Sequence, residues 1–261
     1  MPELPDLEVF KTNIYGRLTS KRLVGLEVFA PQKVSAPGEI LLGNFVGRDL
    51  ARIDRVGKEL IFDFGDRKTL AAHLMLSGEI SIVPQEAVGA IRFKIFSLCF
   101  ERETIVFSDR GGLCTIRQMP LPDKAPDAFG AAFTPEYFRA AARAKARVNI
   151  KAFLIDQKVV KGIGNAYADE ILWAARISPY SLVGKIPEDR LEALYRAIGT
   201  VLRDAINSIR RIAPNIISGE ERGFLKVHNK TIKKTETGYP IHVERIASKI
   251  TYYTEEQTTY L

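Results

Sequence analysis

The sequence has few cysteines and no long apolar run, and these absences exclude several classes of protein. Only Cys99 and Cys114 occur among 261 residues, which excludes a disulfide-stapled secreted scaffold and a four-cysteine zinc site. No segment approaches the roughly 18 apolar residues of a membrane-spanning helix, and the N-terminus lacks a basic and then apolar signal peptide. We therefore expect an intracellular, non-secreted protein in a reducing compartment, with no membrane contact.

Charged residues are plentiful, and bases outnumber acids unevenly along the chain. The sequence holds 38 Lys and Arg against 31 Asp and Glu, which gives a net charge of +7 and a pI near 9.3. Residues 139–161 hold seven bases and one acid, and residues 203–250 hold ten bases and five acids. This excess suits a polyanion partner, although a solvated helix face gives the same pattern. With 46% hydrophobic residues and a mean hydropathy of −0.05, a globular chain is expected.

Hydrophobic periodicity divides the chain into a β-rich first part and a helical second part. An apolar stripe at helical spacing predicts a helix over residues 5–19. Short apolar segments between Gly, Pro or Asp turns follow, and their spacing favours an antiparallel sandwich. The expected strands are 23–29, 45–56, 60–64, 69–74, 79–83, 91–100 and 104–108. The expected helices are 135–145, 148–156, 165–176 and 187–211.

These elements predict an α+β multidomain protein. A β-sandwich domain flanked by helices is expected over residues 1–120, and a proline-containing linker over 121–134. A helical domain is expected over 135–219. The final segment, 220–261, holds short β-like pieces at 225–227, 231–233, 241–243 and 250–253.

The N-terminus carries the first candidate catalytic residues. Initiator Met1 is usually removed before a small residue such as Pro2, and the mature chain then begins with a secondary amine. More of such an amine than of a lysine is neutral and nucleophilic at pH 7. The adjacent Glu3 carboxylate has the chemistry to move protons on and off a sugar oxygen. On these residues alone, an ordinary chain start with an acid at a helix N-terminus is the simpler interpretation.

Two turns in the β-rich part carry further candidates. Gly57 allows a turn between two strands, which presents Lys58 at its tip. The Lys58 charge there is either functional or an ordinary solvated charge of a turn. The segment His73–Gly78 ends a strand, and its Leu76 would be unusual at an exposed tip unless it inserts between bases. Core packing is the alternative for Leu76.

The most specific motif lies between residues 150 and 170. A short helix ends near Gln157, a turn containing Gly162 and Gly164 follows, and a new helix opens at Asn165. Glycines let backbone amides approach a ligand closely, and a helix N-terminus directs its N–H groups at an anion. With Lys151 close in sequence, this pattern predicts a phosphate-binding site.

These motifs, in this order, resemble the formamidopyrimidine-DNA glycosylase and endonuclease VIII family of DNA repair enzymes, over nearly the whole chain. Pro2-Glu3-Leu4-Pro5 matches the start of the family, Gly57-Lys58 its hairpin lysine, and His73–Gly78 its intercalation loop. Residues 150–175 are similar to its helix-two-turn-helix, and the C-terminal hairpin to its finger. The resemblance implies that double-stranded damaged or abasic DNA binds in a cleft between two domains. It also implies a monomer that acts in the cytoplasm or nucleoid without a cofactor.

The resemblance also implies a bifunctional mechanism. The damaged nucleotide is flipped out of the stack, Pro2 attacks C1′ to form a Schiff base, and Glu3 moves protons during β,δ-elimination. Lys58 binds the phosphate beside the lesion and assists catalysis. Residues implied to contact DNA are His73, Leu76, Lys151, Asn165 and Lys249.

Departures from the family bear on the lesion. Asp6 stands where Glu is frequent, and Gly112 and Leu113 stand where one branch carries an Arg-Phe pair, with Arg110 nearby. The connection 216–224 is short for a loop that caps oxidised guanine. The missing Arg-Phe pair and the short connection favour oxidised pyrimidines, while Arg110 leaves the alignment of that pair open. The alternatives are an 8-oxoguanine and formamidopyrimidine glycosylase, or a non-catalytic protein that binds damaged DNA or structured RNA.

The C-terminal finger differs most from the family. Zinc-bearing relatives carry two Cys-x-x-Cys pairs, whose positions fall here on Lys234, Thr237, Thr254 and Gln257. None supplies a thiolate or imidazole, so we predict a zincless finger held by strand pairing and by packing of Tyr239, Tyr252 and Tyr253. Lys249 stands where the family has a phosphate-gripping arginine. A lysine keeps the charge but loses the bidentate fork.

Overall fold

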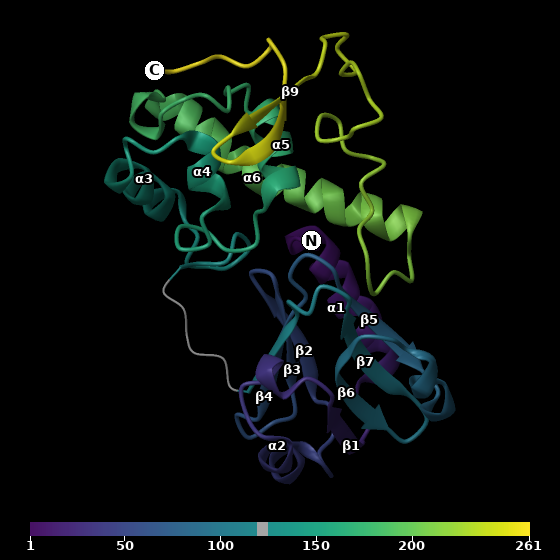
Figure 1. Ribbon diagram of the computed structural model, residues 1–261. Helices are drawn as coiled ribbons and strands as arrows, with labels where there is room; N and C mark the ends of the chain where they lie inside the picture. Colours follow the sequence, from purple (N-terminus) through teal and green to yellow (C-terminus); the bar gives the residue numbers. More distant parts are fainter. Residues whose placement is uncertain (119–124) are drawn as a thin grey trace. The chain divides into compact units, whose positions relative to one another are not determined.

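The computed structural model describes residues 1–118 and 125–261 (Figure 1). Their contacts form two compact units. The first comprises Met1–Pro2, Asp6–Pro122 and Ala213–Glu220, and the second Glu3–Pro5, Asp123–Ile212 and Glu221–Leu261. Of the predicted linker, residues 121–124 lie outside the described residues. Residues 125–134 belong to the second unit, where the Ala128 amide donates to the Lys161 carbonyl oxygen at 3.1 Å.

The described part of the first unit consists mainly of two antiparallel sheets and two helices. One sheet has the order β1-β6-β7-β5 and the other β2-β3-β4-β8. The helices are α1 (Leu4–Leu18) and α2 (Gly38–Phe45), and short 3-10 turns lie at Pro31–Lys33 and Gln85–Ala90. The strands are β1 (Leu23–Val28), β2 (Arg52–Val56), β3 (Glu59–Asp63), β4 (Thr69–His73), β5 (Gly78–Val83), β6 (Lys94–Phe100), β7 (Thr104–Asp109) and β8 (Thr115–Gln118).

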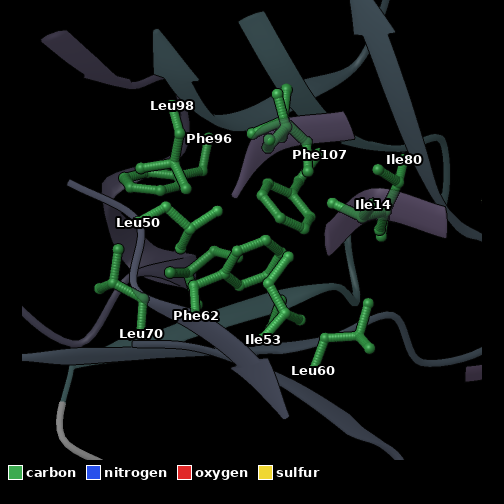
Figure 2. Close-up of a cluster of buried hydrophobic side chains, with 14 of the residues drawn as sticks. Ile14, Leu50, Ile53, Leu60, Phe62, Leu70, Ile80, Phe96, Leu98 and Phe107 are labelled. Atoms are coloured by element: carbon green, nitrogen blue, oxygen red, sulfur yellow. The ribbon is translucent and has the colours of Figure 1, made fainter. Parts of the chain in front are cut away.

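The core of this unit is rich in phenylalanine and branched aliphatic residues. Figure 2 shows Phe62 of β3 and Phe107 of β7 beside each other, and their rings meet edge-on with centroids 5.7 Å apart. Alternate residues of β3 are buried, as expected for a strand with one face on the core. Burying one such side chain contributes about 1.5–3 kcal/mol, so this cluster stabilises the sandwich strongly.

The second unit is mainly helical. Its helices are α3 (Pro135–Ala144), α4 (Ile150–Ile155), α5 (Asn165–Ala174) and α6 (Glu188–Ile212), with a 3-10 turn at Val183–Lys185. Thr134 and Asn149 cap α3 and α4, because their side-chain oxygens accept backbone N–H groups of the first turn. The apolar stripe of α6 is buried, from Leu191 to Ile209.

A two-stranded hairpin completes the second unit. It pairs β9 (His242–Ile246) with β10 (Lys249–Tyr253), and Figure 1 shows it in yellow beside α5. The turn residues Ala247 and Ser248 have φ of 50° and 63°, a conformation that favours Asn and Gly. The strands expected at 225–227 and 231–233 are not present, and that prediction was wrong.

The predicted α+β class is confirmed: antiparallel sheets, then helices and a C-terminal hairpin. Strand 45–56 was predicted too long, because Phe45 ends α2, and neither α2 nor β8 was predicted. Within residues 1–118 and 125–261, no helix has the length and apolar character needed to cross a membrane.

Candidate active site

Glu3 lies at the N-terminus of α5, where three backbone amides hold its carboxylate. Oε2 accepts from the Gly164 and Tyr167 amides at 2.7 and 3.4 Å, and Oε1 accepts from Ala166 at 3.0 Å. Only 4% of Glu3 is exposed. The positive end of the helix dipole stabilises a carboxylate here. The anion site predicted from the glycine motif is thus filled by a carboxylate of the same chain.

The glycines of the motif make room for this arrangement. A Cβ atom on Gly164 would lie 2.3 Å from Glu3 Cδ, and one on Gly162 would lie 2.7 Å from Leu4 Cδ1. Gly162 also has φ of +100°, which L side chains rarely adopt. The Gln157 side chain closes the turn, since it accepts from the Gly162 amide and donates to the Ile163 carbonyl.

Lys151 is fully buried, and its ammonium is saturated by protein groups. Nζ lies 2.7 Å from Asp169 Oδ1, donates to Thr251 Oγ1 at 2.6 Å, and donates to the Ile250 carbonyl at 3.2 Å. Burial lowers the pKa of Lys151, and Asp169 opposes this effect. These contacts do not fit the direct phosphate contact expected from the sequence, because a phosphate would have to displace an ion pair with no exposed surface.

Asn165 and Lys249 both lie close to Ile250 at the start of β10. The Asn165 amide nitrogen donates to the Ile250 carbonyl at 2.9 Å, the same oxygen that Lys151 binds. Its second N–H is not used by this bond. Lys249 is exposed at the first position of β10, one residue from that carbonyl. Three of the predicted DNA-binding residues are therefore brought together around one peptide group of the hairpin.

Lys58 follows Gly57 in a two-residue turn between β2 and β3. Gly57 has φ of +60°, which permits the tight connection. The Arg55 guanidinium, 3% exposed, donates to the Gly57 carbonyl and to Glu8 Oε2, both at 2.9 Å. Burial alone would raise the pKa of Glu8, but Lys11 and Arg55 outweigh it and lower the pKa. Arg55 thereby fixes the turn against α1.

His73 ends β4 and pairs with Glu59, the residue after Lys58. Its Nδ1 accepts the Met75 amide at 3.0 Å, so this nitrogen carries no proton. Burial lowers the pKa of His73, Glu59 opposes the change, and Lys58 adds to it. The neutral ring then carries its proton on Nε2 as a donor.

Leu76 is 65% exposed at the tip of the turn between β4 and β5. Met75 adopts φ of 54°, and a Cβ on Gly78 would lie 2.3 Å from the Leu74 carbonyl oxygen, so a tight turn requires glycine there. The Asp109 carboxylate connects this turn to the loop that follows β7. It accepts from Ser77 Oγ at 2.6 Å and from the Gly111, Leu113 and Cys114 amides at 2.6–2.8 Å.

Pro2 is buried in the first unit and is followed directly by Glu3. The amine ahead of it belongs to Met1, whose ammonium forms an ion pair with Glu220. The Pro2 nitrogen is an amide until Met1 is removed.

The sequence analysis missed two acidic residues of α5 that anchor the hairpin and the segment before it. Asp169 Oδ2 contacts His228 Nδ1 at 2.7 Å and accepts the Tyr252 amide at 3.0 Å. Glu170 accepts the amides of residues 226, 227 and 228 at 2.7–3.0 Å. Two acids inside the otherwise apolar run Ala166–Ala174 are the signal that could have shown these anchors.

The finger residues do not fit a zinc ion. Lys234, Thr237, Thr254 and Gln257 supply no thiolate or imidazole, and the described ranges contain no group of three His, Cys, Asp or Glu suited to a metal. The Tyr252 ring packs against His228 with the planes tilted by 54° and the centroids 4.5 Å apart, and Tyr253 packs edge-on against Tyr180 at 5.5 Å. Tyr239 is 45% exposed, so the packing predicted for it was wrong.

Comparison with known proteins gives a consistent result. The model of the formamidopyrimidine-DNA glycosylase N-terminal domain matches residues 1–115, and that of its H2TH domain matches residues 125–213. The formamidopyrimidine-DNA glycosylase of Carboxydothermus hydrogenoformans is 30% identical over 249 residues, 88% of this chain and 89% of the relative. That of Lactococcus lactis subsp. lactis is 29% identical over 271 residues, 97% of each chain.

Solved structures agree. Lactococcus lactis Fpg in complex with DNA containing an oxidised pyrimidine has a TM-score of 0.85 and 25% identity, covering 99% of this chain and 100% of that one. A variant of the same enzyme with DNA containing Fapy-dG has a TM-score of 0.85 and 26% identity, with the same coverage. The chain therefore belongs to the formamidopyrimidine-DNA glycosylase family, whose members are DNA glycosylases with abasic-site lyase activity.

Proposed function

We propose that this chain removes oxidised pyrimidines from double-stranded DNA and then cleaves the abasic site. The observation that carries the proposal is the carboxylate of Glu3, fixed by three amides at the start of α5 and joined by one peptide bond to Pro2. A protein that only binds DNA has no need of an oriented carboxylate beside a potential secondary amine. The family to which the chain belongs supports the same reaction class.

In this proposal the reaction begins once Met1 has been removed. The lone pair of the Pro2 nitrogen forms a bond to C1′ as the bond from C1′ to the damaged base breaks. Glu3 takes the proton from the Pro2 nitrogen and passes it to the sugar oxygen as the ring opens. The base leaves as its anion, and an iminium forms between Pro2 and C1′. The iminium acidifies the neighbouring C–H, so β- and then δ-elimination release the two phosphates.

Contacts to phosphate come from side chains with available donors. His73 offers Nε2–H, Asn165 offers its second amide hydrogen, and Lys249 offers an exposed ammonium. Lys58, which is only 9% exposed at the turn between β2 and β3, is assigned to the phosphate beside the lesion on the resemblance to the family. Leu76, exposed on a rigid turn, fills the space left by the flipped nucleotide. Lys151, held inside the protein, positions the Ile250 peptide instead of touching DNA.

The preference for pyrimidines rests on two loops. Residues 110–113 carry no aromatic side chain, and Leu113 is 38% exposed where a branch of the family has phenylalanine. The segment after α6 is short and anchored, since the Ile216 carbonyl accepts from Asn13 at 2.8 Å and Ser218 Oγ accepts the Ile80 amide at 2.9 Å. Few residues are left for a loop that encloses an oxidised guanine. We expect the protein to act as a monomer in the cytoplasm, at the nucleoid.

A second candidate is excision of 8-oxoguanine and formamidopyrimidine. The names of the relatives favour it, and one solved neighbour carries Fapy-dG DNA. A panel of duplexes separates the candidates, with thymine glycol in one and 8-oxoguanine opposite cytosine in another. We expect faster single-turnover excision of thymine glycol. Faster excision of 8-oxoguanine would refute the pyrimidine preference. Tight binding without excision of either lesion would refute the proposed glycosylase activity.

A further inference from the structure

The carboxylate of Glu256 lies at the centre of a compact group of hydrogen-bond donors. Oε1 accepts from Thr237 Oγ1 at 2.7 Å and from the Arg176 guanidinium. Oε2 accepts from Trp173 Nε1 at 2.9 Å, Thr254 Oγ1 at 3.1 Å and Thr235 Oγ1 at 3.3 Å. The Glu256 side chain is only 7% exposed. We refer to these six residues as the Glu256 cluster.

The cluster joins three separate parts of the second unit. Thr235 and Thr237 belong to a turn closed by the Thr235 amide on the Tyr239 carbonyl at 2.9 Å. Thr254 belongs to a second turn, directly after β10, where its amide donates to Gln257 Oε1 at 2.8 Å. Trp173 lies in the last turn of α5, and Arg176 lies two residues beyond the end of that helix. One carboxylate thus links both turns to the helix.

These are the two turns in which zinc-bearing relatives would carry their cysteine pairs. Of the four corresponding positions, Thr237 and Thr254 donate directly to Glu256, and Gln257 is bound to Thr254 and to the Ile177 carbonyl. A zinc ion in such a finger cross-links the turns through four thiolates. Here the charges are reversed: the central group is an anion, the Glu256 carboxylate, and hydrogen-bond donors surround it.

We propose that the Glu256 carboxylate replaces zinc as the organising centre of the finger and positions Lys249 for DNA. A two-stranded hairpin is marginally stable alone, so β9 and β10 need an external anchor. Hydrogen bonds to a charged acceptor contribute more than neutral ones, and five converge here. Burial would raise the pKa of Glu256, but bonds from Thr237, Trp173, Thr254 and Arg176 outweigh it and lower the pKa to about 2. Glu256 is a positioning residue, and its effect on DNA rests on the proposed function.

The chain contains a single tryptophan, which is a member of the cluster. Its indole N–H therefore gives one NMR resonance and one fluorescence signal that report on the carboxylate directly. A hydrogen bond to an anionic acceptor shifts an indole proton downfield. This signal is independent of DNA.

The test compares Glu256→Gln with Glu255→Gln in the full chain. Glu255 is the adjacent acid and is 76% exposed, so it controls for the loss of one negative charge. We expect Glu256→Gln to move the indole resonance upfield and to weaken binding to a duplex with a tetrahydrofuran abasic analogue at least tenfold. The cleavage rate of bound abasic DNA at saturating enzyme should change less than threefold. Glu255→Gln should match the wild type in each measurement.

A milder variant covers the case in which Glu256→Gln does not fold. Thr237→Val removes one donor from an exposed position and should shift the indole resonance in the same direction, with a smaller loss of affinity. An unmoved indole resonance in Glu256→Gln, or wild-type affinity in both cluster variants, would overturn the proposal. Failure of the wild type to bind the duplex would refute the proposed function instead, while the indole measurement would still test the cluster.

Discussion

The position of Gly164 makes a sharp prediction about Glu3. A Cβ atom at residue 164 would lie 2.3, 2.5 and 2.7 Å from Glu3 Cδ, Oε1 and Oε2. The backbone there has φ of −124° and ψ of −162°, which alanine adopts without strain. Gly164→Ala should therefore leave the fold intact and displace one group, the Glu3 carboxylate.

The expected loss follows from the bonds that the carboxylate gives up. Hydrogen bonds to a charged group contribute about 1.5–3 kcal/mol each, and the displaced carboxylate loses up to three. A misplaced proton-transfer group costs about 10²–10⁴ in rate. We expect Gly164→Ala to excise thymine glycol at least about 100-fold more slowly while binding abasic-analogue DNA within about threefold of the wild type. Glu3→Gln should give the same result, because in both variants the proton transfer is lost and the DNA contacts remain.

The assay is single-turnover excision and lyase kinetics with excess enzyme, next to thermal unfolding. Gly16→Ala is the matched control, since a Cβ at residue 16 of α1 meets nothing within 4 Å. It should keep wild-type activity. Wild-type turnover in Gly164→Ala, with folding intact, would refute the reasoning that the amide-bound position of Glu3 is the productive one.

Three further predictions concern the finger and its partner. Lys249→Ala should weaken binding to lesion DNA about tenfold and reduce the slope of log K against log[salt] by about 1, because one phosphate contact is lost. Lys249→Arg should bind at least as tightly as the wild type. An unchanged slope in the alanine variant would show that Lys249 does not contact a phosphate. Metal analysis should find no stoichiometric zinc, and activity should survive a strong chelator; one zinc per chain would contradict the donor set. The folded-state pKa of Glu256 is about 2 against 4.5 for a free glutamate, so its stabilisation is complete above pH 4.5 and lost as the pH falls towards 2. In acid unfolding, the stability difference between wild type and Glu256→Gln should shrink across this window, and a constant difference would argue against an ionised carboxylate in the cluster.

Elements with a strong local pattern were predictable from the sequence. The apolar stripes of α1 and α6 specify a buried helix face, and Gly162 and Gly164 mark the turn before α5 because side chains cannot fit there. The helix α2 was missed because it has only eight residues, and the contiguous apolar residues Ile40–Leu42 obscure the i, i+4 spacing of its buried Leu41 and Phe45. The strand β8 has four residues, pairs with β4 and forms a single parallel bridge from Ile116 to Val34, so it is too short to show a period of its own.

Long-range polar contacts were not predictable from the sequence. Glu256 bonds to Trp173 and Arg176, which are 83 and 80 residues away, and no local spacing indicates such a pair. Likewise, composition gave no sign that Lys151 is buried, because a lysine in a basic segment usually faces solvent. A phosphate was expected at the turn before α5, but the group bound there is the carboxylate of Glu3, which lies more than 160 residues away in the chain.

The central claim is that the Pro2 amine attacks the sugar, and covalent trapping tests it most directly. Wild-type protein is incubated with a duplex containing one abasic site in the presence of borohydride, which reduces an iminium to a stable amine. The account predicts one covalent adduct per chain, with Met1 absent from the intact mass and the DNA attached to the residue-2 nitrogen on peptide mapping. An active enzyme that retains Met1, or an adduct mapped to Lys58 instead, would contradict it.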